Sequence, residues 1–138
     1  MALQRTMRFP GRFESLEKIS QYVAKAAEEA GFDEFTTYNL QLAVDEACSN
    51  IIEHAYGAED VGEIDCVCRD TGEALKITLK DWGRSFDPNN VPEPDYSQSL
   101  EKIGPRGAGL WLIKKIMDEV KYHFTPEGNE LEMVKVKM

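Results

Sequence analysis

The most informative stretch of this 138-residue chain runs from Leu42 to Gly57 and reads Leu-Ala-Val-Asp-Glu-Ala-Cys-Ser-Asn-Ile-Ile-Glu-His-Ala-Tyr-Gly. Glu46 and Asn50 are four residues apart, so in a helix they share one face, one turn from each other. The side-chain oxygen of Asn50 is a hard ligand that suits Mg²⁺. The Glu46 carboxylate is able to accept a proton from a hydroxyl group or water. A polar helix face without function has the same spacing, so the pattern needs support from the rest of the chain.

Patterns on both sides of this stretch predict one α+β domain over residues 1–138. The expected elements are a strand at 3–9, helices at 15–30 and 33–56, strands at 63–69 and 74–80, a helix at 109–119, and strands at 120–124 and 130–137. Paired strands joined by short turns favour a mostly antiparallel sheet with helices on one face, a two-layer α/β sandwich. We find no internal repeat or linker.

Four residues predict where the first two helices begin and end. Ser15 and Asp33 are candidate N-caps, while Gly31 and Gly57 are expected C-terminal stops. Apolar residues support the second helix: Phe35, Tyr38, Leu42, Cys48, Ile51, Ile52 and Ala55.

A second cluster, Asp81-Trp82-Gly83, follows an apolar strand directly. A carboxylate presented at a strand end can accept a hydrogen bond from the exocyclic amine of adenine. Gly83 would let a base approach the backbone closely, because glycine has no Cβ. An ordinary turn that contains Asp gives the same sequence.

A third cluster, Gly104 to Lys114, reads Gly-Pro-Arg-Gly-Ala-Gly-Leu-Trp-Leu-Ile-Lys and leads into a helix. Glycines before a helix N-terminus expose backbone N–H groups, and the helix dipole adds positive potential, so this segment suits an anion. It lacks the Gly-Lys-Ser/Thr ending of a Walker A motif and the spacing of a dinucleotide fingerprint. A loop with glycines for turn geometry is the alternative.

Charge and composition exclude several classes of protein. The net charge of −9 repels a phosphate backbone, so nucleic-acid binding is not expected. There is no apolar run that could span a bilayer and no secretory signal pattern, which predicts a cytoplasmic protein without a membrane segment. Cys48, Cys66 and Cys68 are expected to be buried free thiols.

The three clusters occur in one order, and together they resemble the GHKL ATPase superfamily. Residues 42–57 look like its N box, Asp81-Trp82-Gly83 like its G1 box, and residues 106–110 like its G2 box. Within the superfamily, the chain is most similar to bacterial anti-sigma-factor serine kinases, on the evidence of the Glu-His-Ala-Tyr ending of the N box and the Gly-Leu-Trp-Leu-Ile segment.

This resemblance implies a Bergerat ATP-binding fold, with ATP and Mg²⁺ bound between helices and sheet under a lid at 89–104. Glu46 would be the general base, Asn50 the Mg²⁺ ligand, and Asp81 and Gly83 the adenine contacts. The phosphates would be held by Gly107, Ala108, Gly109 and Leu110, with Arg106 placed to reach a terminal phosphate.

The chain departs from the family pattern at two positions. Ser85 stands where the G1 box usually has a second Gly, and no Thr follows Gly128 near the last hairpin, where many members have one that supports the adenine site. Asn129 is the candidate substitute for that Thr.

The resemblance implies a protein-serine kinase that phosphorylates a STAS-domain anti-anti-sigma partner and alternately sequesters a sigma factor. An ATP-binding regulatory switch with little or no kinase activity is the alternative. A detached histidine-kinase catalytic domain is a third reading, disfavoured by the short lid and by a chain that starts with its own first strand. The sequence is compatible with a homodimer.

Overall fold

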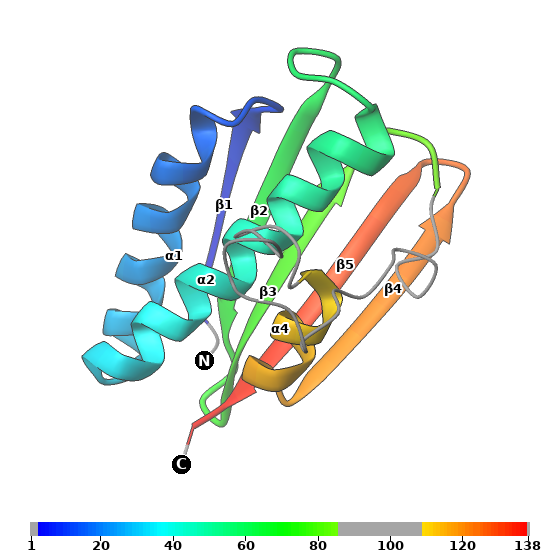
Figure 1. Ribbon diagram of the computed structural model, residues 1–138. Helices are drawn as coiled ribbons and strands as arrows, with labels where there is room; N and C mark the ends of the chain where they lie inside the picture. The colour runs from blue at the N-terminus through cyan, green and yellow to red at the C-terminus, as the bar shows by residue number, and fades with distance from the viewer. Residues whose placement is uncertain (1–2, 86–108, 138) are drawn as a thin grey trace, which may run out of the picture.

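A computed structural model describes residues 3–85 and 109–137, and this part of the chain forms a five-stranded sheet with helices packed on one face (Figure 1). Every pair of neighbouring strands is antiparallel, in the order β1-β2-β3-β5-β4. The elements are β1 (Leu3–Pro10), α1 (Ser15–Ala30), α2 (Glu34–Asn50), the π-helix η1 (Ile51–Tyr56), β2 (Glu63–Asp70), β3 (Ala74–Asp81), α4 (Gly109–Ile116), β4 (Glu119–Thr125) and β5 (Gly128–Val136). The predicted two-layer sandwich and its order of elements are confirmed.

The core lies between the sheet and the helices, where the strands bury apolar side chains on one face, most regularly in β3. In β3, Leu75, Ile77 and Leu79 are buried against the helices. Lys76 and Lys80 point to the opposite, open face, where Lys76 forms an ion pair with Glu132 of β5 at 2.8 Å. Strict alternation of this kind fixes the register, since a slip of one residue would turn the apolar set outward.

The predicted helix ends are mostly confirmed. Asp33 caps α2 by accepting a hydrogen bond from the Thr36 N–H at 2.8 Å. Gly31 and Gly57 end their helices with φ of 97° and 81°, a conformation that glycine adopts without strain. The prediction for Ser15 was wrong: Glu14 occupies the cap position of α1 without a side-chain cap, and Ser15 is the first helical residue.

Helix α2 lies at the centre of the helical layer and packs against both α1 and α4 (Figure 1). Two of its apolar residues that supported the helix, Phe35 and Tyr38, are exposed, while Leu40, Val44 and Cys48 form the buried stripe. All three cysteines are buried and free, as predicted. The helix continues without a break into η1, so residues 34–56 are helical, close to the range expected from the sequence.

The last three elements differ from expectation mainly in their bounds. Helix α4 ends at Ile116 instead of Glu119, and β4 begins at Glu119. Strand β5 lies between β3 and β4, with Asn129 paired to Asp81 (Figure 1). This pairing brings the start of the last strand to the end of β3, where the Asp81 cluster lies.

Candidate functional site

Buried polar side chains gather where the C-terminal half of α2 covers the end of β3. Among the described residues, Glu46 and Asn50 of α2, Asp81 of β3 and Asn129 of β5 are each at most 5% exposed. Burying a carboxylate or a carboxamide is unfavourable unless a partner compensates for the lost water. Four buried carboxylate or carboxamide groups in one region therefore indicate a candidate ligand-binding site rather than ordinary core packing.

Glu46 and Asn50 lie on the same face of α2, as their spacing predicts. The residues that follow each of them, Ala47 and Ile51, border a cavity together with Asp81. The helix residues and the end of β3 therefore belong to one region, although 30 residues of sequence lie between Asn50 and Asp81.

The Asp81 carboxylate is held through one of its oxygens. Its Oδ1 accepts hydrogen bonds from the Gly83 N–H and from the Asn129 Nδ2, both at 2.9 Å. Within residues 3–85 and 109–137, no hydrogen bond reaches Oδ2, which remains able to accept one from a ligand. Burial raises the pKa of Asp81 above its ordinary value, and the hydrogen bonds from Asn129 and Gly83 oppose that shift.

The Asn129 carboxamide connects the whole turn after β3. Its Nδ2 also donates to the carbonyl oxygens of Gly83 at 3.0 Å and Arg84 at 3.3 Å. Its Oδ1 accepts a hydrogen bond from the Ser85 hydroxyl at 2.9 Å. The two residues that depart from the family pattern, Ser85 and Asn129, thus bond to each other, and this bond directs the Asn129 amino group toward Asp81.

Gly83 is required by its contact with the end of the helix. A Cβ at this position would lie 2.5 Å from the Ala55 carbonyl oxygen and 2.6 Å from its carbon. These are backbone atoms that cannot turn aside, so a larger residue would push the turn away from η1. The sequence suggested a different reason for this glycine, the close approach of a base.

The apolar wall beside Asp81 was missed by sequence reasoning. A small cavity of about 10 Å³ borders Asp81 and Asn129. Tyr122 and Phe124 of β4 line it together with Leu131 of β5. Burial raises the pKa of the Tyr122 phenol, and the negative charge of Asp81 adds to this effect. Aromatic residues at alternate positions of a strand are common, so the sequence of β4 alone does not single out Tyr122 and Phe124. Only the pairing of β5 with β3 identifies these two aromatic residues as neighbours of the site.

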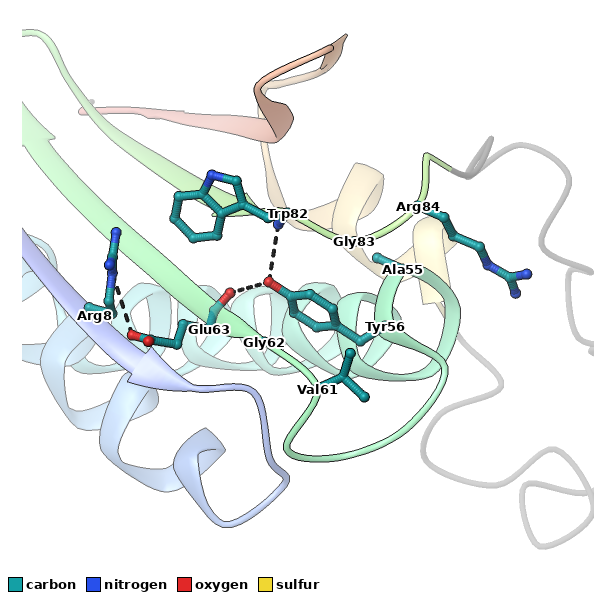
Figure 2. A pocket seen from close by; sticks show the side chains of 9 residues that line it. All are labelled: Arg8, Ala55, Tyr56, Val61, Gly62, Glu63, Trp82, Gly83 and Arg84. Carbon is teal, nitrogen blue, oxygen red and sulfur yellow. Dashed lines mark hydrogen bonds and ion pairs between the residues drawn. The ribbon is translucent and has the colours of Figure 1, made fainter.

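A larger hollow of about 650 Å³ lies beyond the same turn (Figure 2). It contains neither Glu46 nor Asn50, and among the described residues that line it, Gly83 alone belongs to the predicted set. Its lining consists of Arg8, Ala55, Tyr56, Val61, Gly62, Glu63, Trp82, Gly83 and Arg84. We place the candidate site at the buried polar cluster, because Glu46, Asn50 and Asp81, the side chains predicted to bind ATP and Mg²⁺ or to accept a proton, lie there and do not line this hollow.

Part of the predicted site lies outside the described residues. This applies to Arg106, Gly107 and Ala108, and to the predicted lid at 89–104. Gly109 and Leu110 form the start of α4, which packs against α2. The predicted phosphate-binding residues Gly109 and Leu110 therefore begin a helix that packs against α2, the helix that carries Glu46 and Asn50.

No group of three or more His, Cys, Asp or Glu side chains in ranges 3–85 and 109–137 is arranged to hold a metal ion. In the same ranges, the helices are too short or too polar to cross a bilayer.

Comparisons with known proteins show the family of the chain. A family model described as a histidine kinase-like ATPase domain matches residues 9–135. Serine-protein kinase RsbW of Bacillus cereus strain AH187 is 36% identical over 119 residues, which cover 83% of this chain and 74% of that protein. The protein of the same name from Bacillus thuringiensis strain Al Hakam gives the same values.

One solved structure also resembles the chain. The crystal structure of the RsbU and RsbW domains of Rv1364c from Mycobacterium tuberculosis matches 97% of this chain with a TM-score of 0.67. The sequence identity is 14%, so this match shows the fold alone, and the present chain spans 32% of that one.

Proposed function

Since the chain belongs to the family of histidine kinase-like ATPase domains, and within it to the group of serine-protein kinases named RsbW, we propose that it transfers the γ-phosphoryl group of ATP to a serine of a STAS-domain anti-anti-sigma protein. The single observation that carries the site assignment is the buried cluster of Glu46, Asn50 and Asp81. In this role the protein alternately sequesters a sigma factor, acts in the cytoplasm and folds as one domain.

Adenine recognition is assigned to the turn after β3. The Oδ2 atom of Asp81 would accept a hydrogen bond from the exocyclic amine, because Oδ1 already accepts from Gly83 and Asn129. Ala47, Ile51 and Leu131 offer apolar surface to the base beside this carboxylate. A carboxylate that is fixed before the ligand arrives loses little conformational entropy on binding.

The phosphates and the metal are assigned to α2 and to the segment before α4. The side-chain oxygen of Asn50 is the protein ligand for Mg²⁺, a metal that keeps several waters and needs few protein groups. Phosphate contacts are assigned to Arg106, Gly107, Ala108, Gly109 and Leu110. When bound, ATP supplies the phosphoryl group and Mg²⁺ neutralises part of its charge.

Glu46 is the group that handles the proton. It would take the proton of the serine hydroxyl as that oxygen attacks the γ-phosphorus and the bond to the β-phosphate oxygen breaks. ADP would leave, the phosphate ester would remain on the partner, and the Glu46 carboxyl would be protonated. Its place one helical turn before Asn50 puts the base and the metal ligand on one face of α2. The helix thereby fixes the proton acceptor relative to the metal.

Labelled ATP, incubated with the protein and candidate STAS-domain proteins from the same genome, tests the proposal. We expect Mg²⁺-dependent transfer of label to a serine, and a loss of about 10²–10⁴-fold in rate in Glu46→Gln, which keeps the size but cannot take up a proton. Binding of ATP without transfer to any STAS-domain protein would favour the alternative, a regulatory switch. Transfer by Glu46→Gln at the wild-type rate would refute the assignment of the base.

A further inference from the structure

The end of η1 holds the turn that follows β3. The Arg84 backbone N–H donates to the Ala55 carbonyl at 2.9 Å, and the Arg84 Nε donates to the His54 carbonyl at 2.8 Å. The last carbonyl groups of a helix have no partner within the helix. Arg84 therefore satisfies two of them, and the backbone after Asp81 is fixed to the helix that carries Glu46 and Asn50.

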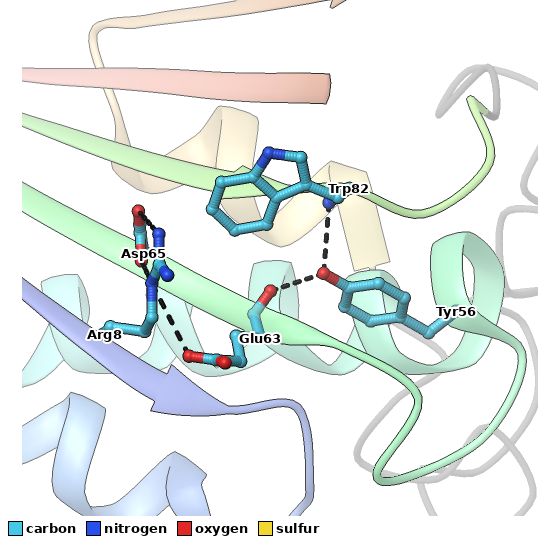
Figure 3. A network of polar contacts seen from close by, with 5 residues as sticks. All are labelled: Arg8, Tyr56, Glu63, Asp65 and Trp82. Atoms are coloured by element: carbon cyan, nitrogen blue, oxygen red, sulfur yellow. Dashed lines mark hydrogen bonds and ion pairs between the residues drawn. The ribbon is translucent and has the colours of Figure 1, made fainter. Parts of the chain in front are cut away.

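The Tyr56 hydroxyl makes the third connection in this joint. It accepts a hydrogen bond from the Trp82 backbone N–H at 3.0 Å and donates one to the Glu63 carbonyl at the start of β2 (Figure 3). One hydroxyl group thus bridges the turn after β3 and the neighbouring strand. The bonded N–H belongs to the peptide group that joins Asp81 to Trp82.

The Tyr56 ring packs directly against Gly62. A Cβ at Gly62 would lie 2.4 Å from the ring atom Cε1 and 2.7 Å from the hydroxyl oxygen. Gly62 has no left-handed φ, so the backbone there does not itself demand glycine. The close approach of the tyrosine ring therefore explains this residue.

The Trp82 side chain is held as well, from the open face of the sheet. The Arg8 guanidinium lies 5.0 Å from the centre of the indole ring and the Lys80 ammonium 5.6 Å, both within cation–π range. Arg8 is itself bound to Asp65 at 2.6 Å (Figure 3). With its side chain and its N–H both fixed, Trp82 sets the positions of its neighbours Asp81 and Gly83.

We propose that Tyr56 is a positioning residue for nucleotide binding, acting through the Trp82 N–H on the Asp81–Gly83 turn. This inference rests on the proposed function, in which Asp81 and Gly83 contact adenine. Tyr56 itself is assigned no contact with the nucleotide. Its removal should therefore alter the affinity for adenine nucleotides and leave the chemical step intact.

The first test compares Tyr56→Phe with the control Tyr38→Phe, which removes the same hydroxyl from an exposed position on α2. We expect Tyr56→Phe to raise the Kd for ADP and the KM for ATP by about 3- to 10-fold, the effect of one hydrogen bond. The kcat at saturating ATP should stay at the wild-type value, and the preference for ATP over GTP should fall. Tyr38→Phe should match wild type in every measurement.

A second variant and a direct measurement distinguish positioning from a general loss of structure. Gly62→Ala displaces the Tyr56 ring without removing its hydroxyl, and we expect it to weaken ADP binding at least as much. Amide hydrogen exchange should accelerate at Trp82 in Tyr56→Phe, while Ile77 in the middle of β3 keeps its protection.

The outcomes separate this inference from the proposed function. A wild-type protein that binds no ADP overturns the proposed function, and this inference with it. If the wild-type protein binds ADP and Tyr56→Phe binds it with the same Kd, only the role of Tyr56 is overturned. A fall in kcat with unchanged KM would also overturn it, because it would place Tyr56 in the chemical step.

Discussion

At the scale of single residues, the orientation of Asp81 depends on Asn129. The Asn129 amino group donates a hydrogen bond to the Asp81 Oδ1, and the Ser85 hydroxyl donates one to the Asn129 Oδ1. A carboxamide has one donor side and one acceptor side, so a partner on the acceptor side decides what the donor side faces. Asp81 is thereby held as an acceptor in a buried place, where an unpaired carboxylate would be unfavourable.

Asn129→Asp replaces the donor by a second carboxylate of nearly the same shape, so we expect ADP affinity at neutral pH to collapse. Two adjacent carboxylates raise each other's pKa, and burial already raises that of Asp81. As the pH falls, the two carboxylates, that of Asp81 and the one introduced at position 129, take up one proton. The protonated carboxyl can then donate a hydrogen bond to the other carboxylate. ADP affinity of this variant should therefore increase as the pH is lowered from about 8 to about 6, and the increase should be larger than any change in wild type.

Ser85→Ala is the matched control for this experiment. It removes the bond that orients the Asn129 amide but leaves the donor in place, so we expect a modest loss of ADP affinity, about 3-fold, without the pH dependence. Calorimetric titration with ADP at several pH values measures both effects, and circular dichroism at each pH shows whether the fold persists. Parallel pH profiles for Asn129→Asp and wild type would contradict the role assigned to Asn129.

At the scale of elements, the end of the second helix and the turn after β3 form one unit. Helix α2 carries Glu46 and Asn50, and its extension η1 holds Trp82 and Arg84, on either side of Gly83, by hydrogen bonds. π-Helical turns are rare and frequently lie at functional sites. A helix that carries the proposed catalytic groups and also fixes the proposed adenine contacts couples the two halves of the site.

Gly83→Ala tests this unit, because its Cβ would meet the Ala55 backbone at 2.5 Å. We expect a loss of about 1–3 kcal/mol in the free energy of unfolding, the usual effect of overpacking. ADP binding should weaken as the turn moves away from η1. Urea unfolding and ADP titration measure the two effects.

The cause of the clash can be checked with a second substitution. Ala55→Gly removes only the Ala55 Cβ, 2.9 Å from the added atom, and leaves the carbonyl group in place. It should therefore fail to restore ADP binding to Gly83→Ala. Full restoration would mean that the side chain, and not the backbone of η1, requires glycine at position 83.

Local signals explain which elements could be predicted. Asp33, Gly31 and Gly57 were identified correctly because capping and left-handed glycines depend on neighbouring residues alone. Ser15 was assigned as a cap by residue type, but the chain turn before α1 places Glu14 there. Phe35 supported the prediction of a helix, yet it is 75% exposed. Helical spacing of apolar residues indicates a helix, but it does not tell whether each of these residues faces the core.

At the scale of the whole molecule, the site depends on a long-range strand pairing. The sequence indicated the β4–β5 hairpin, whose strands are adjacent in the chain, but gave no signal that β5 pairs with β3. That pairing brings Asn129, Tyr122 and Phe124 to Asp81. Glu46, Asn50, Asp81 and Gly83 could be proposed from motifs, and Asn129 from the comparison with the family pattern. The hydrogen bonds of Asn129 and the aromatic residues Tyr122 and Phe124 required the three-dimensional structure.

Thermal stability of the whole domain should report which side chain binds the metal. A ligand that binds only the folded state stabilises it, by about 2.7 kcal/mol at 100 times its Kd. For a domain of this size, saturating ATP with Mg²⁺ should raise the Tm by on the order of 10 °C. ATP with a chelator should give a smaller rise, because the metal no longer links the phosphates to Asn50.

Two substitutions on one face of α2 should then divide this effect. Glu46→Gln keeps the metal ligand, so its Tm should still depend on Mg²⁺ although phosphoryl transfer is lost. Asn50→Ala removes the side-chain oxygen assigned to the metal, so its Tm in ATP should be the same with Mg²⁺ and with chelator. Differential scanning calorimetry of the three proteins, each with and without nucleotide, measures the shifts against their own baselines. If Asn50→Ala keeps the full Mg²⁺-dependent rise in Tm, Asn50 is not a ligand of the metal. In Glu46→Gln, by contrast, the full Mg²⁺-dependent rise in Tm is the expected result, because Glu46 is assigned as the base and not as a metal ligand.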